Sequence, residues 1–416
     1  MGTADILASG RDLTVERPAA VLVGVLAALL ALDFVAKIAG FELTVGSTHL
    51  LGGSLPIERL LTLVWDGLVM GLAIGLAGIG LSMTYSILSF ANFSHGDLVT
   101  SGAFAGWAVT FLIAGLVSGQ GDVGYLLSVG SGQGPTSADL AINVVSTPLA
   151  IVLGLVVAIA ATIVLSLLID RLVYEPMRGE GAISLLIASI GVALVLRYLI
   201  VFVFTGTNRG LTSGGGRLRV LGEEGRLVFE AVVNQPGQPR EVLFSLGLPV
   251  VRFGDYTAEL MNVTSNELTL VVIAVSLMAG LHVLLQRTKL GKSMRAMADN
   301  EDLARVTGIP TERVIRATWL IGGGLTGASG YLIALERGTL SFNLGWVLLL
   351  LIFAAVILGG IGSVYGAMAG GVVIGLANTV SLVWIPSSFT TAAAFAIMIL
   401  MLLFKPEGLF GGVTTA

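Results

Sequence analysis

Four polar side chains fall within six residues between two apolar blocks of the sequence: Asn92, Ser94, His95 and Asp97. Burying such a group without a hydrogen bond costs roughly 2–7 kcal/mol. The four side chains must therefore bond to one another, cap a helix or line a water-filled path. One interpretation is a turn at the membrane surface, in which Asp97 caps a helix that begins at Leu98. The other interpretation is that these residues line a path through the protein.

Residues 287–316 form a strongly charged loop in a sequence that is otherwise apolar. The loop contains 7 of the chain's 22 basic residues, together with four acidic residues. Its middle is predicted to be a short helix that ends before Gly308 and Pro310, and Glu301 precedes Arg305 by one turn, the favourable order for an ion pair. An apolar stripe on this helix fits a groove on a soluble partner, or else rests at the membrane surface as in an ordinary amphipathic helix. The stripe consists of Met294, Met297, Ala298 and Ala304.

The sequence lacks the patterns of catalytic and metal-binding sites. It has no cysteine, which excludes disulfides and thiolate metal ligands. The three histidines, His49, His95 and His282, are far apart and show no metal-ligand spacing. The segment Gly291-Lys-Ser293 resembles the end of a phosphate-binding loop, but Gln286 replaces the required upstream glycine. We therefore expect no enzyme activity, no metal or cofactor in this chain and no nucleic-acid partner.

Long apolar blocks surround these candidates. Hydrophobic residues make up 55% and charged residues 12% of the chain, whereas a soluble domain has about 25% charged residues. The blocks approach the length that a helix needs to cross a bilayer, and they lack the alternation of barrel strands. The predicted fold is an all-α, polytopic helical membrane protein with about eight to ten transmembrane helices and a small β-rich extracellular insert. The blocks are residues 20–39, 60–89, 98–118, 148–171, 182–205, 268–286, 314–335, 346–362, 366–384 and 388–404.

Four ionisable residues lie inside these blocks or at their ends: Asp33, Asp66, Arg197 and Glu336. Ionisable residues within membrane helices are rare and commonly functional. Asp33 and Asp66 lie deeper in their blocks, either as members of structural pairs or as the lining of a path. Arg197 and Glu336 lie near block ends, where a long side chain reaches the interface. The few carboxylates form no proton relay, which counts against an ion-driven carrier.

The charged loop also sets a predicted orientation, because basic residues in short loops stay in the cytoplasm. Alternation from this loop places residues 171–181, the turn at residues 92–97 and both termini on the cytoplasmic side. Residues 1–19 show no signal-peptide cleavage pattern and are predicted to be a cytoplasmic N-terminal segment. The predicted extracellular segments are residues 40–59, 119–147 and 206–267.

The largest of these extracellular segments, residues 206–267, has the pattern of strands. Alternating residues on both sides of Gly222-Glu-Glu-Gly225 predict a β-hairpin, and residues 241–253 favour another strand pair. A small β-rich cap on the outer face is therefore expected. Residues 119–147 are rich in glycine and serine, which favours a loop.

Glycine is frequent, at 56 of 416 residues. Several glycines recur at every fourth position, which removes side chains from one helix face and lets neighbouring backbones approach closely. Tight helix packing is the simpler interpretation; the functional one is that such faces let helices slide when a central path opens. The packing positions are Gly67, Gly71, Gly75, Gly362, Gly366 and Gly370.

Four stretches together resemble one known family. The first is Asn92-Phe-Ser-His-Gly-Asp97, and the second joins Tyr174-Glu-Pro-Met-Arg178 to the Leu-Ile-Ala-Ser-Ile-Gly run at residues 186–191. The third combines Gly291-Lys-Ser-Met-Arg-Ala296 with Asp302-Leu-Ala-Arg-Val-Thr-Gly-Ile309, and the fourth combines residues 358–363, 366–371 and 405–410. The chain resembles the inner-membrane permease subunits of ABC importers in the branched-chain amino-acid (LivH-type) family.

This resemblance implies a permease domain over residues 20–416 that is driven by ATP. ATP and Mg would be bound by two cytoplasmic ATPase subunits, a second permease subunit would complete the path, and an extracellular binding protein would deliver the substrate. The expected substrates are branched-chain or other hydrophobic amino acids, with urea or short amides second. Residues 287–313 would be the coupling loop, with Asp302-Leu-Ala304 in place of the family's Glu-Ala-Ala. The implied coupling residues are Arg295, Asp302, Ala304, Arg305 and Gly308, and the translocation path would include Asn92, Ser94, His95, Asp97 and Asp66.

Two other classes remain as alternatives. A stand-alone secondary transporter or channel needs ion-coordinating groups near the middle of the membrane, and only Asp33 and Asp66 are available. An intramembrane enzyme is disfavoured by the scattered histidines and the missing cysteines.

Overall fold

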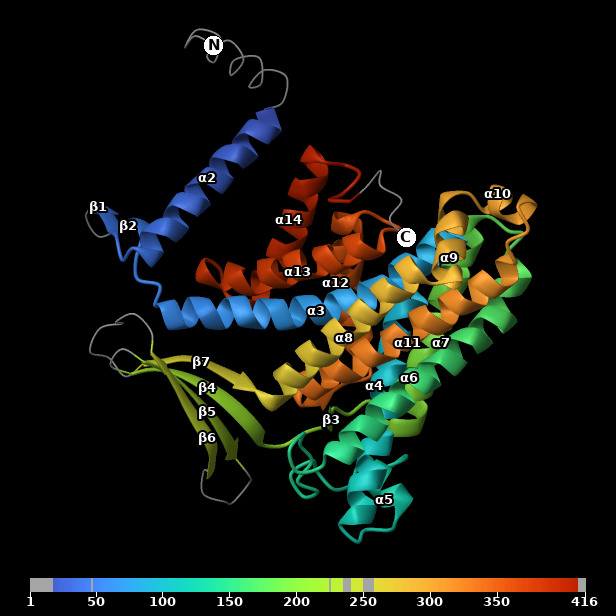
Figure 1. Cartoon of the computed structure of the whole chain (residues 1–416), viewed down its shortest axis with the longest axis horizontal. Helices are drawn as coiled ribbons and strands as arrows, with labels where there is room; N and C mark the ends of the chain where they lie inside the picture. Colours follow the sequence, from blue (N-terminus) through green and yellow to red (C-terminus); the bar gives the residue numbers. More distant parts are fainter. Residues whose placement is uncertain (1–17, 46–47, 224–225, 235–240, 250–257, 411–416) are drawn as a thin grey trace.

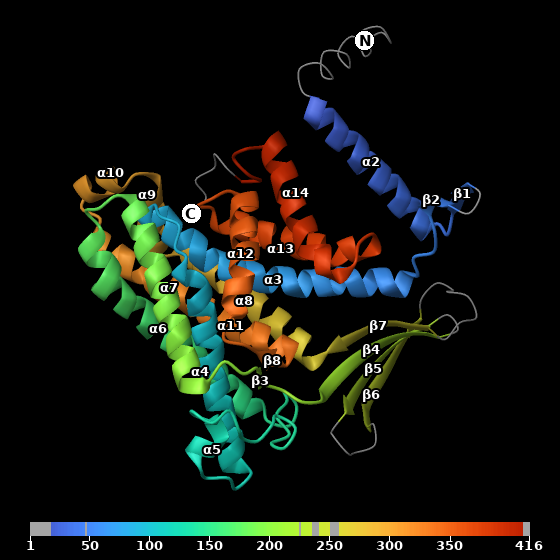
Figure 2. The same ribbon diagram turned by 180° about the vertical axis from the view of Figure 1, so that it is seen from behind.

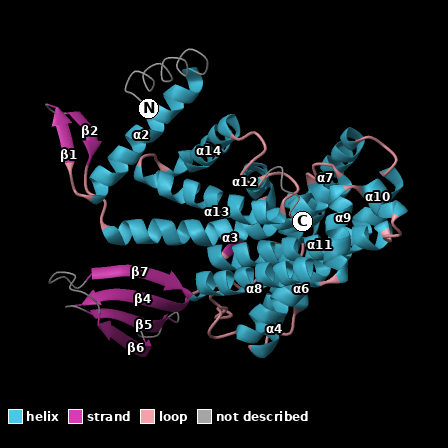
Figure 3. Cartoon of the chain, turned by 45° about the horizontal axis from the view of Figure 1, so that its top comes forward, coloured by secondary structure: helices cyan, strands magenta, loops and turns pink. Residues whose placement is uncertain are grey.

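The computed structural model of the chain describes residues 18–45, 48–223, 226–234, 241–249 and 258–410. Most of its helices form one body, from which the helix α2 extends, and four long strands form a sheet that projects from one end of that body (Figure 3). Most of the predicted N-terminal segment, residues 1–19, lies outside the described residues.

A long helix coincides with each of the ten predicted apolar blocks. They are α2 (Pro18–Ile38), α3 (Ile57–Leu88), α4 (Ser94–Val117), α6 (Pro148–Ile169), α7 (Ala182–Phe204), α8 (Ser265–Arg287), α11 (Thr311–Arg337), α12 (Leu344–Gly359), α13 (Val364–Val380) and α14 (Thr390–Phe404). Short helical turns η1 (Asp170–Tyr174) and η2 (Glu175–Met177) extend α6, while η3 (Ser381–Val383) and η4 (Ser387–Phe389) join α13 to α14.

Seven helices in the described part of the chain are long and apolar enough to cross a membrane. They are α3, α4, α6 with its extension to Met177, α7, α8, α13 with η3, and α14 with η4. Of the other predicted spans, α12 has only 16 residues, and α11 has 27 residues with a glycine-rich middle that is buried almost throughout. A helix enclosed by protein needs no apolar exterior, so hydropathy is a weaker guide for α11 than for the lipid-facing helices.

The two ends of the helical body carry different elements. At one end, here called the loop end, the charged loop forms α9 (Lys289–Asp299) and α10 (Glu301–Val306) (Figure 1). At the opposite end, the sheet end, lie the sheet and the short helix α5 (Val123–Leu127) (Figures 1 and 2). The segment predicted as a loop over residues 119–147 thus contains one short helix, with Asp122 accepting a hydrogen bond at its start.

The sheet has the strand order β6-β5-β4-β7, with all neighbours antiparallel. The predicted hairpin is confirmed, because β4 (Gly215–Glu223) pairs with β5 (Arg226–Asn234) across the expected turn. Of the second predicted strand pair, only the first strand falls within the described residues. The described residues of this segment form one strand, β6 (Glu241–Pro249), while residues 250–253 lie outside the described residues. The fourth strand is β7 (Ala258–Thr264), which runs into α8. The remaining strands form two separate antiparallel pairs. These are β1 (Glu42–Val45) with β2 (Thr48–Gly52), and β3 (Arg209–Gly210) with β8 (Thr339–Leu340).

Glycine faces bring α3 and α13 into backbone contact. A Cβ atom on Gly71 would lie 2.7 Å from the Cα of Val372, and one on Gly375 would lie 2.5 Å from the Cα of Gly71. Gly67 and Gly75 face α13 in the same way, and Gly366 and Gly370 face the backbone of α12. Gly362 does not belong to this set. It lies in the turn between α12 and α13 with a φ of +87°, so the turn conformation, rather than helix packing, requires glycine there.

Candidate functional site

The charged loop folds as two helices rather than the single one expected. Thr288 caps α9, and Asn300 both ends α9 and caps α10 through a hydrogen bond from the backbone N–H of Leu303. The predicted ion pair between Glu301 and Arg305 is present at 2.7 Å. Gly308 follows α10 with a φ of +86°, a conformation that side chains disfavour, so it ends the helix as predicted.

The apolar stripe of the charged loop faces the protein itself. Met294, Met297 and Ala304 are each only 3% exposed, so the prediction that this stripe is free for a partner's groove is wrong. The stripe closes over the loop end of the helical body, which removes it from water. The apolar side chains that α10 exposes are Leu303, at 62%, and Val306, at 84%. These two form the exposed apolar surface of α10.

Hydrogen bonds tie α9 to two membrane helices. Arg295 donates to the side-chain oxygen of Gln286 on α8 at 2.9 Å, and Gln286 donates to the hydroxyl of Tyr365 on α13 at 3.0 Å. The same hydroxyl lies 2.8 Å from Nδ1 of His282 on α8. A displacement of α9 therefore reaches α8 and α13 through direct contacts.

A second set of ionic contacts fixes the connection between α6 and α7. Arg178 donates two hydrogen bonds of 2.8 and 2.9 Å to Asp170 and two of 2.8 and 3.0 Å to Glu312 at the start of α11. Partial burial alone would lower the pKa of Arg178, but the two carboxylates hold it above its ordinary value. The connection at residues 171–181 therefore lies at the same end as the charged loop, as the predicted alternation requires.

Two of the four clustered polar residues bond to this connection. The side-chain oxygen of Asn92 accepts hydrogen bonds from the backbone N–H and hydroxyl of Ser94, at 3.0 and 2.6 Å, and from the hydroxyl of Tyr174 at 3.1 Å. Both side chains are fully buried. The Nδ2 of Asn92 is buried without a partner among the described residues, which leaves its two N–H donors for water molecules or a ligand.

The other two polar residues bond to α3 and α7. Nε2 of His95 donates to the carbonyl oxygen of Ala77 at 2.9 Å. Asp97 forms a bidentate ion pair with Arg197, with distances of 3.0 and 2.9 Å, and the Arg197 guanidinium lies 4.5 Å from the ring centre of Trp346. The prediction that Asp97 caps a helix at Leu98 is wrong, because α4 already begins at Ser94 and the carboxylate turns to α7.

Asp66 lies apart from these four residues. It is on α3, eleven residues before Ala77, which corresponds to about 16 Å along the helix at about 1.5 Å per residue. There it lines a cavity of about 240 Å³ with Glu336 and Arg337, in the half of the body nearer the sheet. Asp33, the other deep carboxylate, is engaged by Lys37, Trp384 and the backbone of Gly52. The structure thus separates the proposed path residues into a buried cluster and one cavity residue.

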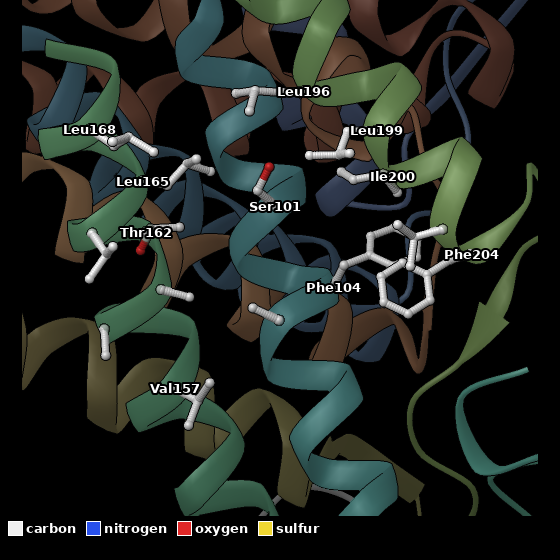
Figure 4. Close-up of a pocket in the computed structure, with 15 residues that line it drawn as sticks. Ser101, Phe104, Val157, Thr162, Leu165, Leu168, Leu196, Leu199, Ile200 and Phe204 are labelled. Atoms are coloured by element: carbon white, nitrogen blue, oxygen red, sulfur yellow. The ribbon is translucent and has the colours of Figure 1, made fainter. Parts of the chain in front are cut away.

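A second cavity is an apolar groove of about 600 Å³ beside α4, between α6 and α7. Figure 4 shows Leu165 and Leu168 of α6 on one side and Leu199 and Ile200 of α7 on the other, with Ser101 of α4 between them. Almost no polar atom lines this groove, so it offers no partner to a charged or strongly polar solute. No group of three or more possible metal ligands occurs in the residues that the structure describes.

The helices that are long and apolar enough to cross a membrane define the class of multi-pass membrane proteins. Residues 63–404 match the family described as the permease component of branched-chain amino acid transport systems, and the chain belongs to this family. As a permease component it is a transport subunit and not an enzyme.

Curated relatives agree with this assignment. The chain is 25% identical over 349 residues to the high-affinity branched-chain amino acid transport system permease protein LivH of Escherichia coli, covering 84% of this chain and 94% of the relative. It is 24% identical over 346 residues to the corresponding protein BraD of Pseudomonas aeruginosa, covering 83% and 94%. A probable LivH of Methanocaldococcus jannaschii is 32% identical over 146 residues, or 33% of this chain and 46% of the relative. No solved structure matches the chain.

Sequence reasoning missed several of these functional contacts. Arg197 was expected to reach the membrane surface, and its pairing with Asp97 joins residues 100 positions apart, for which the sequence offers no signal. The sequence pattern does not single out Leu303 and Val306 as an exposed apolar surface, because the periodic apolar stripe of the loop lies on its other face.

Proposed function

We propose that this chain is the membrane-spanning subunit of an ATP-driven importer that moves branched-chain or other hydrophobic amino acids by alternating access. The relatives in Escherichia coli and Pseudomonas aeruginosa are named as branched-chain amino acid permeases, which supports this substrate class. The partners in this proposal are a second permease subunit, two cytoplasmic ATPase subunits that bind ATP and Mg, and an extracellular binding protein.

The observation that carries the proposal is the exposed apolar surface of α10. A monomeric membrane protein gains nothing from presenting Leu303 and Val306 to water, with exposures of 62% and 84%, on a charged loop. Such a surface suits burial in a groove of a soluble ATPase subunit. Asp302 and Arg305 flank it with opposite charges, which suits recognition at the rim of an interface.

Movement at this interface has a direct route into the membrane. When the ATPase subunits close, α9 and α10 move. Their buried stripe of Met294, Met297 and Ala304 packs against the helical body, so the helices in contact with it move as well. The contacts of Arg295, Gln286 and Tyr365 then carry the displacement to α8 and α13. Because α13 packs on α3 through glycine faces, a small shift changes the helices beside the Asp66 cavity.

The orientation belongs to the same proposal. The loop end faces the cytoplasm, where ATP is available, and the sheet end faces outward, where a binding protein docks. Described residues near the C-terminus lie at the loop end, since the backbone of Leu409 bonds to that of Leu358 at the end of α12. This placement agrees with a cytoplasmic C-terminus.

The test is substitution at the exposed surface of α10. A Leu303→Glu variant is expected to reduce leucine-stimulated ATP hydrolysis and uptake at least tenfold and to weaken co-purification of the ATPase subunits, because a charge replaces an apolar contact. Asp302→Lys combined with Gly308→Pro is expected to do the same. Proline fits neither the φ of +86° nor the hydrogen bond that the backbone N–H of Gly308 donates to Arg305.

Glu180→Lys is the matched control, because it reverses an exposed charge at the loop end outside α9 and α10. This variant is expected to couple normally. Unchanged ATP hydrolysis in the Leu303→Glu complex would contradict the docking role. Uptake by proteoliposomes that contain the chain without any ATPase would instead favour a stand-alone carrier or channel.

A further inference from the structure

The cavity at Asp66 combines charges of both signs with an apolar wall. It lies among α3, α8, α11, α12 and α13 and has a volume of about 240 Å³. Asp66, Glu336 and Arg337 supply the charges, and Thr379 adds a hydroxyl. The remaining lining is aliphatic, including Met70, Ile74, Leu270 and Leu348.

The charges around this cavity differ from the other acidic groups of the helical body because they form no hydrogen bond within the described residues, although Arg337 attracts the neighbouring Glu336. Asp97, Asp170 and Asp33 are all held by cations or hydrogen-bond donors. By contrast, no described residue donates a hydrogen bond to the side chain of Asp66 or Glu336, and Arg337 has no acceptor in the described part of the chain. Asp66 and Arg337 are exposed, so charges of both signs are accessible to a ligand in this single cavity.

We propose that this cavity binds an aliphatic α-amino acid as a zwitterion. The ammonium group of the ligand lies between the carboxylates of Asp66 and Glu336, its carboxylate meets the guanidinium of Arg337, and its side chain rests on Met70, Ile74 and Leu348. This inference rests on the proposed function and adds to it a location and a recognition chemistry for the substrate. Residues from five helices converge here, so occupancy is sensitive to their relative positions.

The size and the position of the cavity fit this ligand. The volume equals roughly eight times the ~30 Å³ that a water molecule occupies in the liquid, which suits a compact ligand such as leucine. Asp66 lies in the first third of α3, while Glu336 and Arg337 end α11 beside the strand β8. All three are therefore in the half of the body nearer the sheet, where substrate arrives in the proposed orientation.

The test measures direct binding of radiolabelled L-leucine to the whole complex of permease and ATPase subunits in nanodiscs, without the binding protein. We expect saturable binding, weakened about ten- to a hundredfold by Asp66→Asn or Arg337→Gln, the range expected for one hydrogen bond to a charged group. Both residues are exposed, so neither change disturbs the packing of the helices. Glu58→Gln, which removes a negative charge from the first turn of α3 outside the cavity, is the matched control and is expected to bind leucine normally.

Competition by leucine analogues tests the assignment of each charge. 4-Methylpentanoate, which lacks the ammonium group, and 3-methylbutylamine, which lacks the carboxylate, are both expected to compete poorly with leucine for the wild-type complex. Asp66→Asn should reduce the preference for leucine over 4-methylpentanoate, and Arg337→Gln the preference over 3-methylbutylamine. Absence of saturable binding, unchanged affinity in both variants, or equal competition by urea or either analogue would overturn the inference. Coupled leucine uptake with unchanged binding in the variants would leave the proposed function standing and remove only this site.

Discussion

Replacing Gly375 by leucine is expected to prevent assembly of the helical body. A Cβ atom at this position would lie 2.5 Å from both the Cα and the N of Gly71, and these are backbone atoms that cannot rotate away. Overpacking a core costs about 1–3 kcal/mol where side chains can adjust. Here α13 must move away from α3 as a whole, so we expect a larger cost and little correctly folded chain. The measurement is the monodisperse fraction after extraction, by fluorescence-detected size-exclusion chromatography.

Gly280 and Gly191 provide the matched controls. Both lie within membrane helices, α8 and α7, and a Cβ atom at either position meets no heavy atom within 4 Å. Leucine at either position is expected to yield normal amounts of monodisperse protein, because the added side chain points into open space at the bundle surface. If Gly375→Leu behaved like these two variants, the close contact of α3 and α13 would not be required for folding.

The helical framework was accessible from the sequence because the bilayer imposes it locally. Each apolar block must form its own hydrogen bonds, so a helix in each block followed from length and hydropathy. The hairpin at β4 and β5 was equally local, since its signal is alternation around a short turn. The α11 helix shows the limit of hydropathy as a guide to membrane spans. A helix that is buried within the body does not need apolar side chains all around it.

The candidate site was less accessible because its contacts depend on which helices are neighbours. Periodicity showed that Met294, Met297 and Ala304 share one face, but periodicity alone does not say whether that face meets a partner or the chain's own helices. Glu336 was expected to extend to the membrane surface because it ends a helix. Its place beside Asp66, 270 positions earlier in the chain, emerges only when α3 and α11 are packed.

Breaking the ion pair between Asp97 and Arg197 is expected to destabilise the protein strongly. The Asp97 side chain is fully buried and that of Arg197 is 14% exposed, so either partner left alone is a nearly dry charge. Removing one partner of such a pair costs about 3–5 kcal/mol. Asp97→Asn and Arg197→Gln should each lower the midpoint of thermal unfolding in detergent. Arg197→Gln should have the larger effect, because it also removes the cation–π contact with Trp346.

The double variant, Asp97→Asn with Arg197→Gln, separates pairing from packing. It leaves no uncompensated charge, so its loss of stability should be smaller than the sum of the two single losses by more than about 0.5 kcal/mol, the usual limit of additivity for independent sites. Additive losses would show that the two residues do not depend on each other. Leucine uptake per assembled complex then tests the path. If the pair only joins α4 to α7, the double variant transports at the wild-type rate once assembled. If Asp97 lines the path, uptake falls even in complexes that have assembled.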